Sequence, residues 1–206
     1  MSALIVTGTD TDVGKTIVAA GLTAALGATY WKPVQAGLIS PTDRETVARL
    51  SARPTLPERY RLRLPASPHL AAEAEGITID TDALSLPDSD APLIVEGAGG
   101  VMVPLTRETL FLDLFARWNA PVVLVARTGL GTINHTGLSI SALRHAGCAL
   151  AGVIFNGPPE PQAEETITQM WRVRHLGRVA PLEGFTPAAL RRAFHGVDTA
   201  HLRRLL

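Results

Sequence analysis

The chain has 206 residues, which suits a single domain over residues 1–206, and its formal net charge is zero. This balance gives no electrostatic basis for binding nucleic acid or an anionic membrane. The single cysteine excludes an internal disulfide, and no apolar run approaches the ~20 residues that span a bilayer. The N-terminus lacks the basic segment of a secretion signal, so we expect a cytoplasmic protein.

Short apolar runs alternate with longer helical patterns along the whole chain. The expected strands are residues 3–8, 28–34, 92–97, 121–127, 150–156 and 175–181. The expected helices are residues 14–26, 43–52, 67–75, 109–118, 133–146, 161–173, 187–194 and 198–205. Several strands are continuously apolar, as in parallel strands buried on both faces. The pattern predicts an α/β fold with a doubly wound, mostly parallel sheet flanked by helices.

Residues 52–91 are rich in Pro, Ser and Asp, and they are the segment that we expect to be most irregular. Two helix starts have a recognisable chemistry. Thr186 is expected to cap a helix that has Pro187 in its first position. The sequence "SPHLAA" at 67–72 indicates a cap followed by Pro, and we assign no chemistry to His69.

The sequence "GTDTDVGKT" at 8–16 follows the first expected strand and precedes a helix, which is the context of a phosphate-binding loop. Glycines allow backbone N–H groups to approach phosphate oxygens, and the helix start favours an anion. Lys15 is placed to neutralise phosphate charge and Thr16 to bind Mg²⁺. The alternative is a plain glycine turn with a surface lysine. Asp10 and Asp12 are unusual in an anion site, because carboxylates repel phosphate.

Carboxylates that could bind Mg²⁺ lie at two other places, since Mg²⁺ prefers oxygen ligands. Glu96 ends the most apolar run, at the edge of the sheet where α/β folds bind ligands, although it could simply be an acid in a glycine turn. Asp43 has two interpretations. It is a possible metal ligand, or it stabilises a helix start in which Thr42 and Glu45 form a capping box.

Other polar residues at strand ends have open interpretations. Lys32 follows the second strand and is either a second cation for phosphoryl transfer or an exposed lysine. The sequence "TGLGTINHTG" at 128–137 is a second glycine-rich helix start and a possible anion site, in which Asn134 is a possible cap. Asn156 ends the fifth strand, where its amide could contact a base or occupy a turn.

Taken together, these motifs resemble the dethiobiotin synthetase family, whose members have a P-loop NTPase fold. The matching sequences are "GTDTDVGKT", "KPVQAG", "PTD", "SPHLAA", "VEGAGG", "LGTINH" and "FNG", in the order of the family and across nearly the whole chain. The phosphate loop with five residues between its glycines is itself a trait of the family. The ordered set is specific, whereas each motif alone is modest evidence.

The resemblance implies a Mg²⁺- and ATP-dependent ligase of biotin biosynthesis. CO₂ adds to one amine of 7,8-diaminononanoate, ATP phosphorylates the carbamate, and the second amine closes a ureido ring as phosphate leaves. It also implies a homodimer with the substrate site at the interface. The sequence offers no nucleophile–base pair, which suits a reaction that depends on positioning.

By the same resemblance, the catalytic residues are Lys15 and Lys32, and the Mg²⁺ ligands are Thr16, Asp43 and Glu96. The implied ATP-binding residues are Asp12, Val13, Gly14, Lys15, Thr16, Ile17, Asp43, Glu96, Gly97, Ala98, Gly99, Asn156, Gly157, Ala180, Pro181 and Leu182. The implied substrate-binding residues are Thr11, Ala36, Gly131, Thr132, Ile133 and Asn134, the last four capping the substrate of the other subunit. Asp10 or Asp12 would then bind a substrate ammonium.

Two positions depart from the pattern of the family. Ala36 stands where many relatives have Ser or Thr, which leaves Gln35 as a possible substitute, and Ala180 stands where Pro is common. A rival interpretation is a dimeric ATPase switch of the partition or division-site type. Those proteins carry a lysine early in the phosphate loop, where this chain has Thr or Asp.

Overall fold

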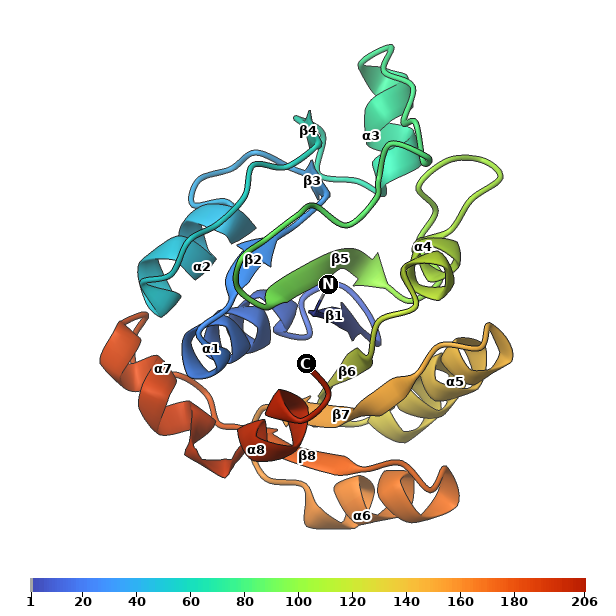
Figure 1. The fold of residues 1–206 in the computed structure, drawn as a ribbon. Helices are drawn as coiled ribbons and strands as arrows, with labels where there is room; N and C mark the ends of the chain where they lie inside the picture. Colours follow the sequence, from blue (N-terminus) through green and yellow to red (C-terminus); the bar gives the residue numbers. More distant parts are fainter. Residues whose placement is uncertain (1) are drawn as a thin grey trace.

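The computed structural model describes residues 2–206 and contains a six-stranded parallel sheet (Figure 1). The strand order is β2-β5-β1-β6-β7-β8. The strands are β1 (Ala3–Gly8), β2 (Thr29–Trp31), β5 (Leu93–Gly100), β6 (Val122–Arg127), β7 (Leu150–Asn156) and β8 (His175–Val179). This arrangement confirms the prediction of a doubly wound parallel sheet.

Helices cover both faces of this sheet, because successive strand residues point to opposite faces. Leu4 and Val6 of β1 lie in one apolar cluster and Ile5 lies in the other. The first cluster packs under α1 (Lys15–Leu26), α2 (Asp43–Ser51), α7 (Pro187–Ala193) and α8 (Thr199–Arg203), with the short helix η1 (Phe194–Gly196) between the last two. The second packs under α3 (Pro68–Ala74), α4 (Phe111–Trp118), α5 (Thr132–His145) and α6 (Pro161–Met170). Figure 1 shows these two groups on opposite sides of the strands.

The strand order places β1 between β5 and β6, at the point where the winding direction changes. In open α/β sheets, ligands bind outside the carboxyl ends of the strands at this switch point. The loop after β1 therefore lies where a ligand site is expected.

The expected strand 28–34 is wrong as a single element. The chain forms β2, leaves the main sheet at Lys32 and Pro33, and forms β3 (Val34–Ala36), which pairs in parallel with β4 (Tyr60–Leu62) in a second sheet. Pro33 has no N–H to donate to a ladder, and its carbonyl instead accepts from the backbone N–H groups of Arg59 and Tyr60. Residues 52–91 are thus more regular than predicted, since β4 lies within them.

Other boundaries differ by a few residues. β5 continues through the glycines to Gly100, which pairs with Gly8, so the predicted strand end at residue 97 is wrong and Glu96 does not lie in a glycine turn. β8 ends at Val179 rather than at 181, and α6 ends at Met170 rather than at 173. The remaining differences are one or two residues at the starts and ends of helices. The Thr186 cap is confirmed, whereas the Ser67 hydroxyl makes no cap hydrogen bond.

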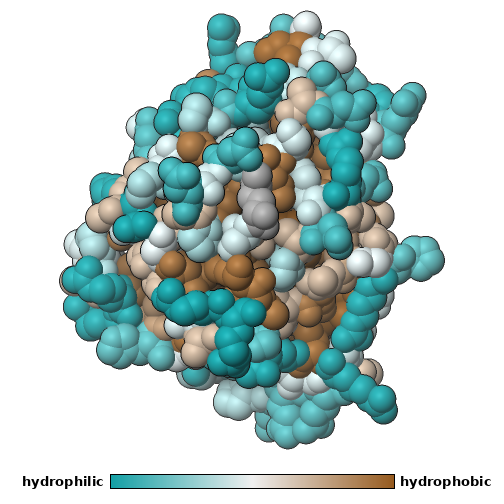
Figure 2. All heavy atoms as spheres, in the orientation of Figure 1, coloured by the Kyte–Doolittle hydropathy of each residue, from teal (hydrophilic) through white to brown (hydrophobic). Residues whose placement is uncertain are grey.

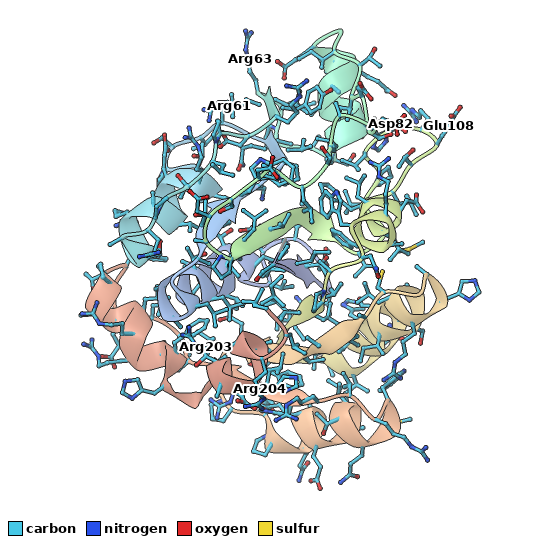
Figure 3. All side chains as sticks on the ribbon, in the orientation of Figure 1. Arg61, Arg63, Asp82, Glu108, Arg203 and Arg204 are labelled. Carbon is cyan, nitrogen blue, oxygen red and sulfur yellow. The ribbon has the colours of Figure 1, made fainter. Side chains whose placement is uncertain are left out.

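Figure 3 labels four of the arginines. Arg61 of β4 and Arg63 after it lie at the upper margin of this view, whereas Arg203 at the end of α8 and Arg204 after it lie within the outline. Figure 2 shows the same face, with hydrophilic surface around its rim and apolar surface gathered nearer its middle. Among residues 2–206, none of the helices combines the length and apolar character needed to cross a bilayer.

Candidate active site

The loop between β1 and α1 has the backbone shape of a phosphate cradle. Gly14 precedes α1 with φ +93°, and Asp12 also has a positive φ of 57°. A Cβ on Gly14 would lie 2.1 Å from Nδ2 of Asn156, so both the conformation and the space require glycine. Lys15 folds over the loop, and its Nζ donates to the Asp10 carbonyl at 2.7 Å.

Three oxygen-bearing side chains from distant parts of the chain meet beside this loop. Oγ1 of Thr16 lies 2.8 Å from Oδ1 of Asp43 and 3.0 Å from Oε1 of Glu96. Thr16 is in the first turn of α1, Asp43 begins α2, and Glu96 lies in β5. The structure therefore brings together the three predicted metal ligands.

Lys32 lies between the two carboxylates. The register of β2 and β5 pairs Trp31 with Val95, which places the next residue, Lys32, beside Glu96. Nζ of Lys32 lies 2.5 Å from Oδ2 of Asp43 and 3.3 Å from Oε1 of Glu96, and the side chain is buried. Lys32 is thus not an exposed lysine.

The predicted capping box forms at the start of α2 without using the Asp43 carboxylate. Thr42 accepts from the backbone N–H of Glu45, and the Glu45 carboxylate accepts from the Thr42 N–H at 2.8 Å, so these two residues form the capping box. Asp43 is then free to contact Thr16 and Lys32.

The charges in this cluster shift one another's protonation. Burial lowers the pKa of Lys32, but Glu96 and Asp43 outweigh it and the pKa is raised overall. Burial raises the pKa of Asp43, but Lys32 outweighs it and the pKa is lowered. Burial keeps the pKa of Glu96 raised despite Lys32, and it keeps the pKa of Lys15 lowered despite Glu96. At neutral pH, Lys32 and Asp43 form a charged pair inside the protein.

Lys15 and Lys32 are the only lysines in the sequence, in which arginine is otherwise the residue with a permanent positive charge. Both lysines are buried, with exposed fractions of 6% and 5%. A lysine ammonium is a compact point charge that suits a crowded phosphate site. This bias is a signal in the sequence that supports a role for Lys32.

A cavity of about 740 Å³ opens from this cluster. Its polar lining comes from the phosphate loop, the two lysines, the two carboxylates, Gln35 and Ser67. Its apolar lining consists of Ala36, Pro65, Ala66, Pro68, Ala98 and Val103. Residues 65–68, which lie within the segment expected to be most irregular, therefore contribute to the lining of the cavity.

The predicted residues Thr11, Asp12, Gly14, Ala36, Ala98 and Gly99 line this cavity together with Lys15, Thr16, Lys32, Asp43 and Glu96. Val13, Ile17 and Gly97 do not line it. Gly97 instead packs against Phe115, where a Cβ would lie 2.8 Å from Cζ of the ring.

The two acids of the loop behave differently. Asp12 is exposed and lines the cavity, whereas Asp10 does not line it and its carboxylate accepts from the Thr11 N–H at 2.7 Å. Of the two, only Asp12 is therefore placed to contact a molecule in the cavity. Gln35 also lines the cavity, but its Nε2 donates to the Gly37 carbonyl at 3.1 Å and its buried Oε1 has no partner among residues 2–206.

The predicted adenine-contacting residues lie on the other side of the loop. Nδ2 of Asn156 donates to the Val13 carbonyl at 3.1 Å, and the Gly157 N–H donates to the Val179 carbonyl. These bonds hold the end of β7 between the phosphate loop and the end of β8, from which Ala180, Pro181 and Leu182 continue.

The second glycine-rich turn lines a separate cavity of about 830 Å³ at the start of α5. The predicted residues Gly131, Thr132, Ile133 and Asn134 line it, and none of them reaches the first cavity. The cap residue of α5 is Gly131, so the interpretation of Asn134 as the cap is wrong. One chain therefore does not bring together the two sets of predicted substrate residues.

Sequence reasoning missed Tyr30. Its side chain is fully buried, and its hydroxyl donates to Oε2 of Glu96 at 2.8 Å. An aromatic residue in an apolar strand looks like ordinary core, so nothing in the sequence points to this contact.

The cluster fits Mg²⁺. Its donors are hard oxygens from two carboxylates and a hydroxyl, which is the chemistry that Mg²⁺ prefers when it also binds nucleotide phosphates. Two carboxylate oxygens lie within hydrogen-bond distance of the Thr16 hydroxyl, which has only one proton to donate. A cation bound among these oxygens would stabilise the oxygen that receives no proton. Within residues 2–206, no group of three or more His, Cys, Asp or Glu side chains offers another site.

The sheet order, the loop and the converging lysines define a P-loop nucleotide-binding protein, and known structures agree. A family model described as an AAA domain matches residues 2–189. The cell-division ATPase MinD of Pyrococcus furiosus is 14% identical with a TM-score of 0.55, covering 100% of this chain and 97% of that one. The ParA family ATPase of Chlorobium tepidum is 10% identical with a TM-score of 0.51, covering 99% and 96%. At these identities the likeness shows the fold alone.

Sequence relatives give the family. The ATP-dependent dethiobiotin synthetase of Rhodopseudomonas palustris strain HaA2 is 59% identical over 93% of this chain and 91% of its own length. Those of Nitrobacter hamburgensis and Brucella anthropi are 56% and 55% identical, covering 93% and 92% of this chain and 92% and 91% of their own lengths. The chain belongs to the dethiobiotin synthetase family. Membership confirms the predicted resemblance and the prediction of an ATP-dependent ligase.

Proposed function

We propose that this protein closes the ureido ring of dethiobiotin from 7,8-diaminononanoate, CO₂ and ATP, as a step of biotin biosynthesis. The single observation that carries the proposal is the cavity, whose lining combines two buried lysines and three oxygen-bearing side chains that meet with several apolar side chains. The polar lining suits a triphosphate with its metal, and the apolar lining suits the alkyl chain of the substrate.

The reaction proceeds in three steps. An amine nitrogen attacks CO₂ and loses a proton, giving a carbamate. A carbamate oxygen attacks the γ-phosphorus of ATP, releasing ADP and forming a mixed anhydride. The second amine attacks the anhydride carbonyl carbon and loses a proton, and phosphate leaves with the bonding pair as the ring closes. Bound Mg²⁺ would neutralise charge on the phosphates during the transfer.

The residues of the chain have distinct roles in this proposal. Backbone N–H groups of the loop and the start of α1 hold the phosphates, as helix starts favour anions. Lys15 and Lys32 stabilise the negative charge on the transferring phosphoryl group. Thr16, Asp43 and Glu96 would hold Mg²⁺, and a cation bound to the two carboxylates would leave the Lys32 ammonium available to the phosphate. Thr11 and Asp12 face the reacting end of the substrate.

We further propose that the enzyme acts as a homodimer, with each chain folded as one domain over residues 1–206. Gly131 to Asn134 do not line the first cavity in the same chain, so the partner's copy of this turn would complete the site. Leu130 and Leu138 beside this turn are highly exposed, at 101% and 63%, which suits burial by a second chain. Because ATP is supplied in the cytoplasm, the proposal places the enzyme there.

The test is an assay of phosphate release with Mg²⁺-ATP, bicarbonate and the diamine. We expect release to depend on the diamine and to match dethiobiotin formation mole for mole. Lys32→Met should lower turnover by about two orders of magnitude or more, as the loss of a group that stabilises the transition state does. Arg191→Met, which removes an exposed cation far from the cavity, should have no effect. Phosphate release that ignores the diamine would contradict the proposal and favour the ATPase switch.

A further inference from the structure

We propose that Tyr30 is a positioning residue that fixes the Glu96 carboxylate so that a single oxygen, Oε1, faces the metal site. The inference rests on the proposed role of Glu96 as a Mg²⁺ ligand, and it concerns how the chain builds that ligand. Three observations carry it: the hydrogen bonds of Glu96, the strand register and the burial of Tyr30.

The two oxygens of Glu96 have different partners. Oε1 lies 3.0 Å from Oγ1 of Thr16 and 3.3 Å from Nζ of Lys32, on the side of the cavity. Oε2 accepts from the Tyr30 hydroxyl at 2.8 Å, which is its sole donor among residues 2–206. The last torsion of a glutamate side chain is broad and sets no preferred orientation by itself. The Tyr30 hydrogen bond therefore selects which oxygen faces Thr16.

The strands make this contact rigid. Tyr30 pairs with Ile94 across β2 and β5, and Ile94 and Glu96 point to the same face of the sheet because they are two residues apart. The Tyr30 ring thus reaches along this face to the carboxylate. On its outer side, the Tyr30 backbone exchanges hydrogen bonds with the segment 54–56, since its N–H donates to Pro54 and its carbonyl accepts from Leu56.

Fixing one oxygen matters for Mg²⁺ in particular. This ion requires near-ideal octahedral geometry, so a carboxylate that rotates binds it poorly. Hydrogen bonds that orient metal ligands are worth about 10- to 100-fold in metal affinity in other proteins. A purely structural hydroxyl would stabilise the fold without any such effect on the metal.

The matched experiment uses the only two tyrosines of the chain. Tyr30→Phe removes the hydroxyl and keeps the ring, whereas Tyr60→Phe removes a hydroxyl that contacts the Asp80 N–H, outside the site. Nucleotide binding is measured without diamine, at increasing Mg²⁺ and in EDTA. We expect Tyr30→Phe to raise the Mg²⁺ concentration for half-maximal binding about tenfold or more, with unchanged binding in EDTA. Tyr60→Phe should match the wild type.

Two further measurements test whether the Tyr30 hydroxyl acts through Glu96. Glu96→Gln alone and with Tyr30→Phe should show the same Mg²⁺ requirement, because the hydroxyl acts through the carboxylate. In protein labelled at tyrosine ¹³Cζ, the Tyr30 signal should shift when Mg²⁺ is added to the nucleotide complex, and the Tyr60 signal should not. An unchanged Mg²⁺ requirement in Tyr30→Phe, or an unmoved Tyr30 signal, would overturn the inference. Wild-type binding that ignores Mg²⁺ would instead count against the proposed metal site itself.

Discussion

Lys15 and Lys32 are both buried, yet their surroundings shift their pKa values in opposite directions. Lys15 donates to a backbone carbonyl, so burial prevails and its pKa is lowered. Lys32 lies against two carboxylates, which prevail over burial and raise its pKa. The Lys32 ammonium therefore compensates the charge of two carboxylates in the core. The Lys15 ammonium, which donates to a carbonyl, is available to bind an anion.

We predict that Lys32→Met destabilises the fold by about 3 kcal/mol at pH 7, because it leaves two carboxylates without their cation. Burial already raises the pKa of Glu96, and loss of Lys32 removes the attraction that opposes this. A carboxyl whose pKa is raised on folding costs stability above its unfolded value, near 4.5, and this cost disappears as the pH falls toward that value. The deficit should therefore be larger at pH 7 than at pH 5, as measured by urea unfolding.

Lys15→Met is the control for this prediction. Since burial dominates at Lys15, the loss of this ammonium should cost much less stability than the loss of Lys32, with little dependence on pH between 5 and 7. A Lys32→Met deficit that is equal at both pH values would contradict the charge balance described here.

At the scale of elements, two glycines let aromatic rings lie directly on helices. A Cβ on Gly21 of α1 would lie 2.0 Å from Cε2 of Phe194, and a Cβ on Gly137 of α5 would lie 2.0 Å from Cζ2 of Trp171. Neither glycine has a positive φ, so their role is close packing. The first contact holds η1 against α1, the helix that begins at the phosphate loop.

We predict that Gly21→Ala lowers the free energy of unfolding, although the same change within an exposed helix would raise it by about 1 kcal/mol. The added methyl collides with the Phe194 ring, and such overpacking costs about 1–3 kcal/mol. Denaturant unfolding of Gly21→Ala, Phe194→Leu and the double variant measures the effect. The double variant should be more stable than the sum of the single losses implies. A higher midpoint for Gly21→Ala would show that Phe194 does not press on α1.

For the whole molecule, the two sets of predicted substrate residues lie in different cavities. Ala36 and Thr11 line the first, and Gly131 to Asn134 line the second. Leu138 lines both the second cavity and a third one of about 390 Å³ beside β5, so exposed apolar surface is continuous there. A second chain bound to this surface would bring the two sets of predicted substrate residues together in one site.

We predict that Leu138→Asp produces a monomer, because a buried charge at the centre of an interface is costly. Sedimentation velocity measures the oligomeric state, and calorimetry measures binding. The monomer should bind Mg²⁺-ATP as the wild type does and should lose affinity for the diamine. Leu205→Asp, which changes an exposed leucine just after α8, should remain dimeric. A monomeric wild type, or a Leu138→Asp dimer, would contradict the proposed interface.

The sequence by itself determined the parallel sheet, the phosphate loop, the capping box of Thr42 and Glu45 on either side of Asp43, and the family. These are local signals, since an apolar run, a glycine spacing or a cap depends on residues that are close together in the chain. It also indicated Lys32 and Glu96, because the carboxyl ends of parallel strands share one edge.

Only the tertiary structure decided the rest. The break at Pro33 depends on pairing with residues 59–62, and the contact between Tyr30 and Glu96 depends on the register of β2 and β5. The cavity wall at 65–68 and the separation of Gly131 from Ala36 depend on how distant segments pack. Register and packing are set by contacts across the fold, and no spacing along the chain encodes them.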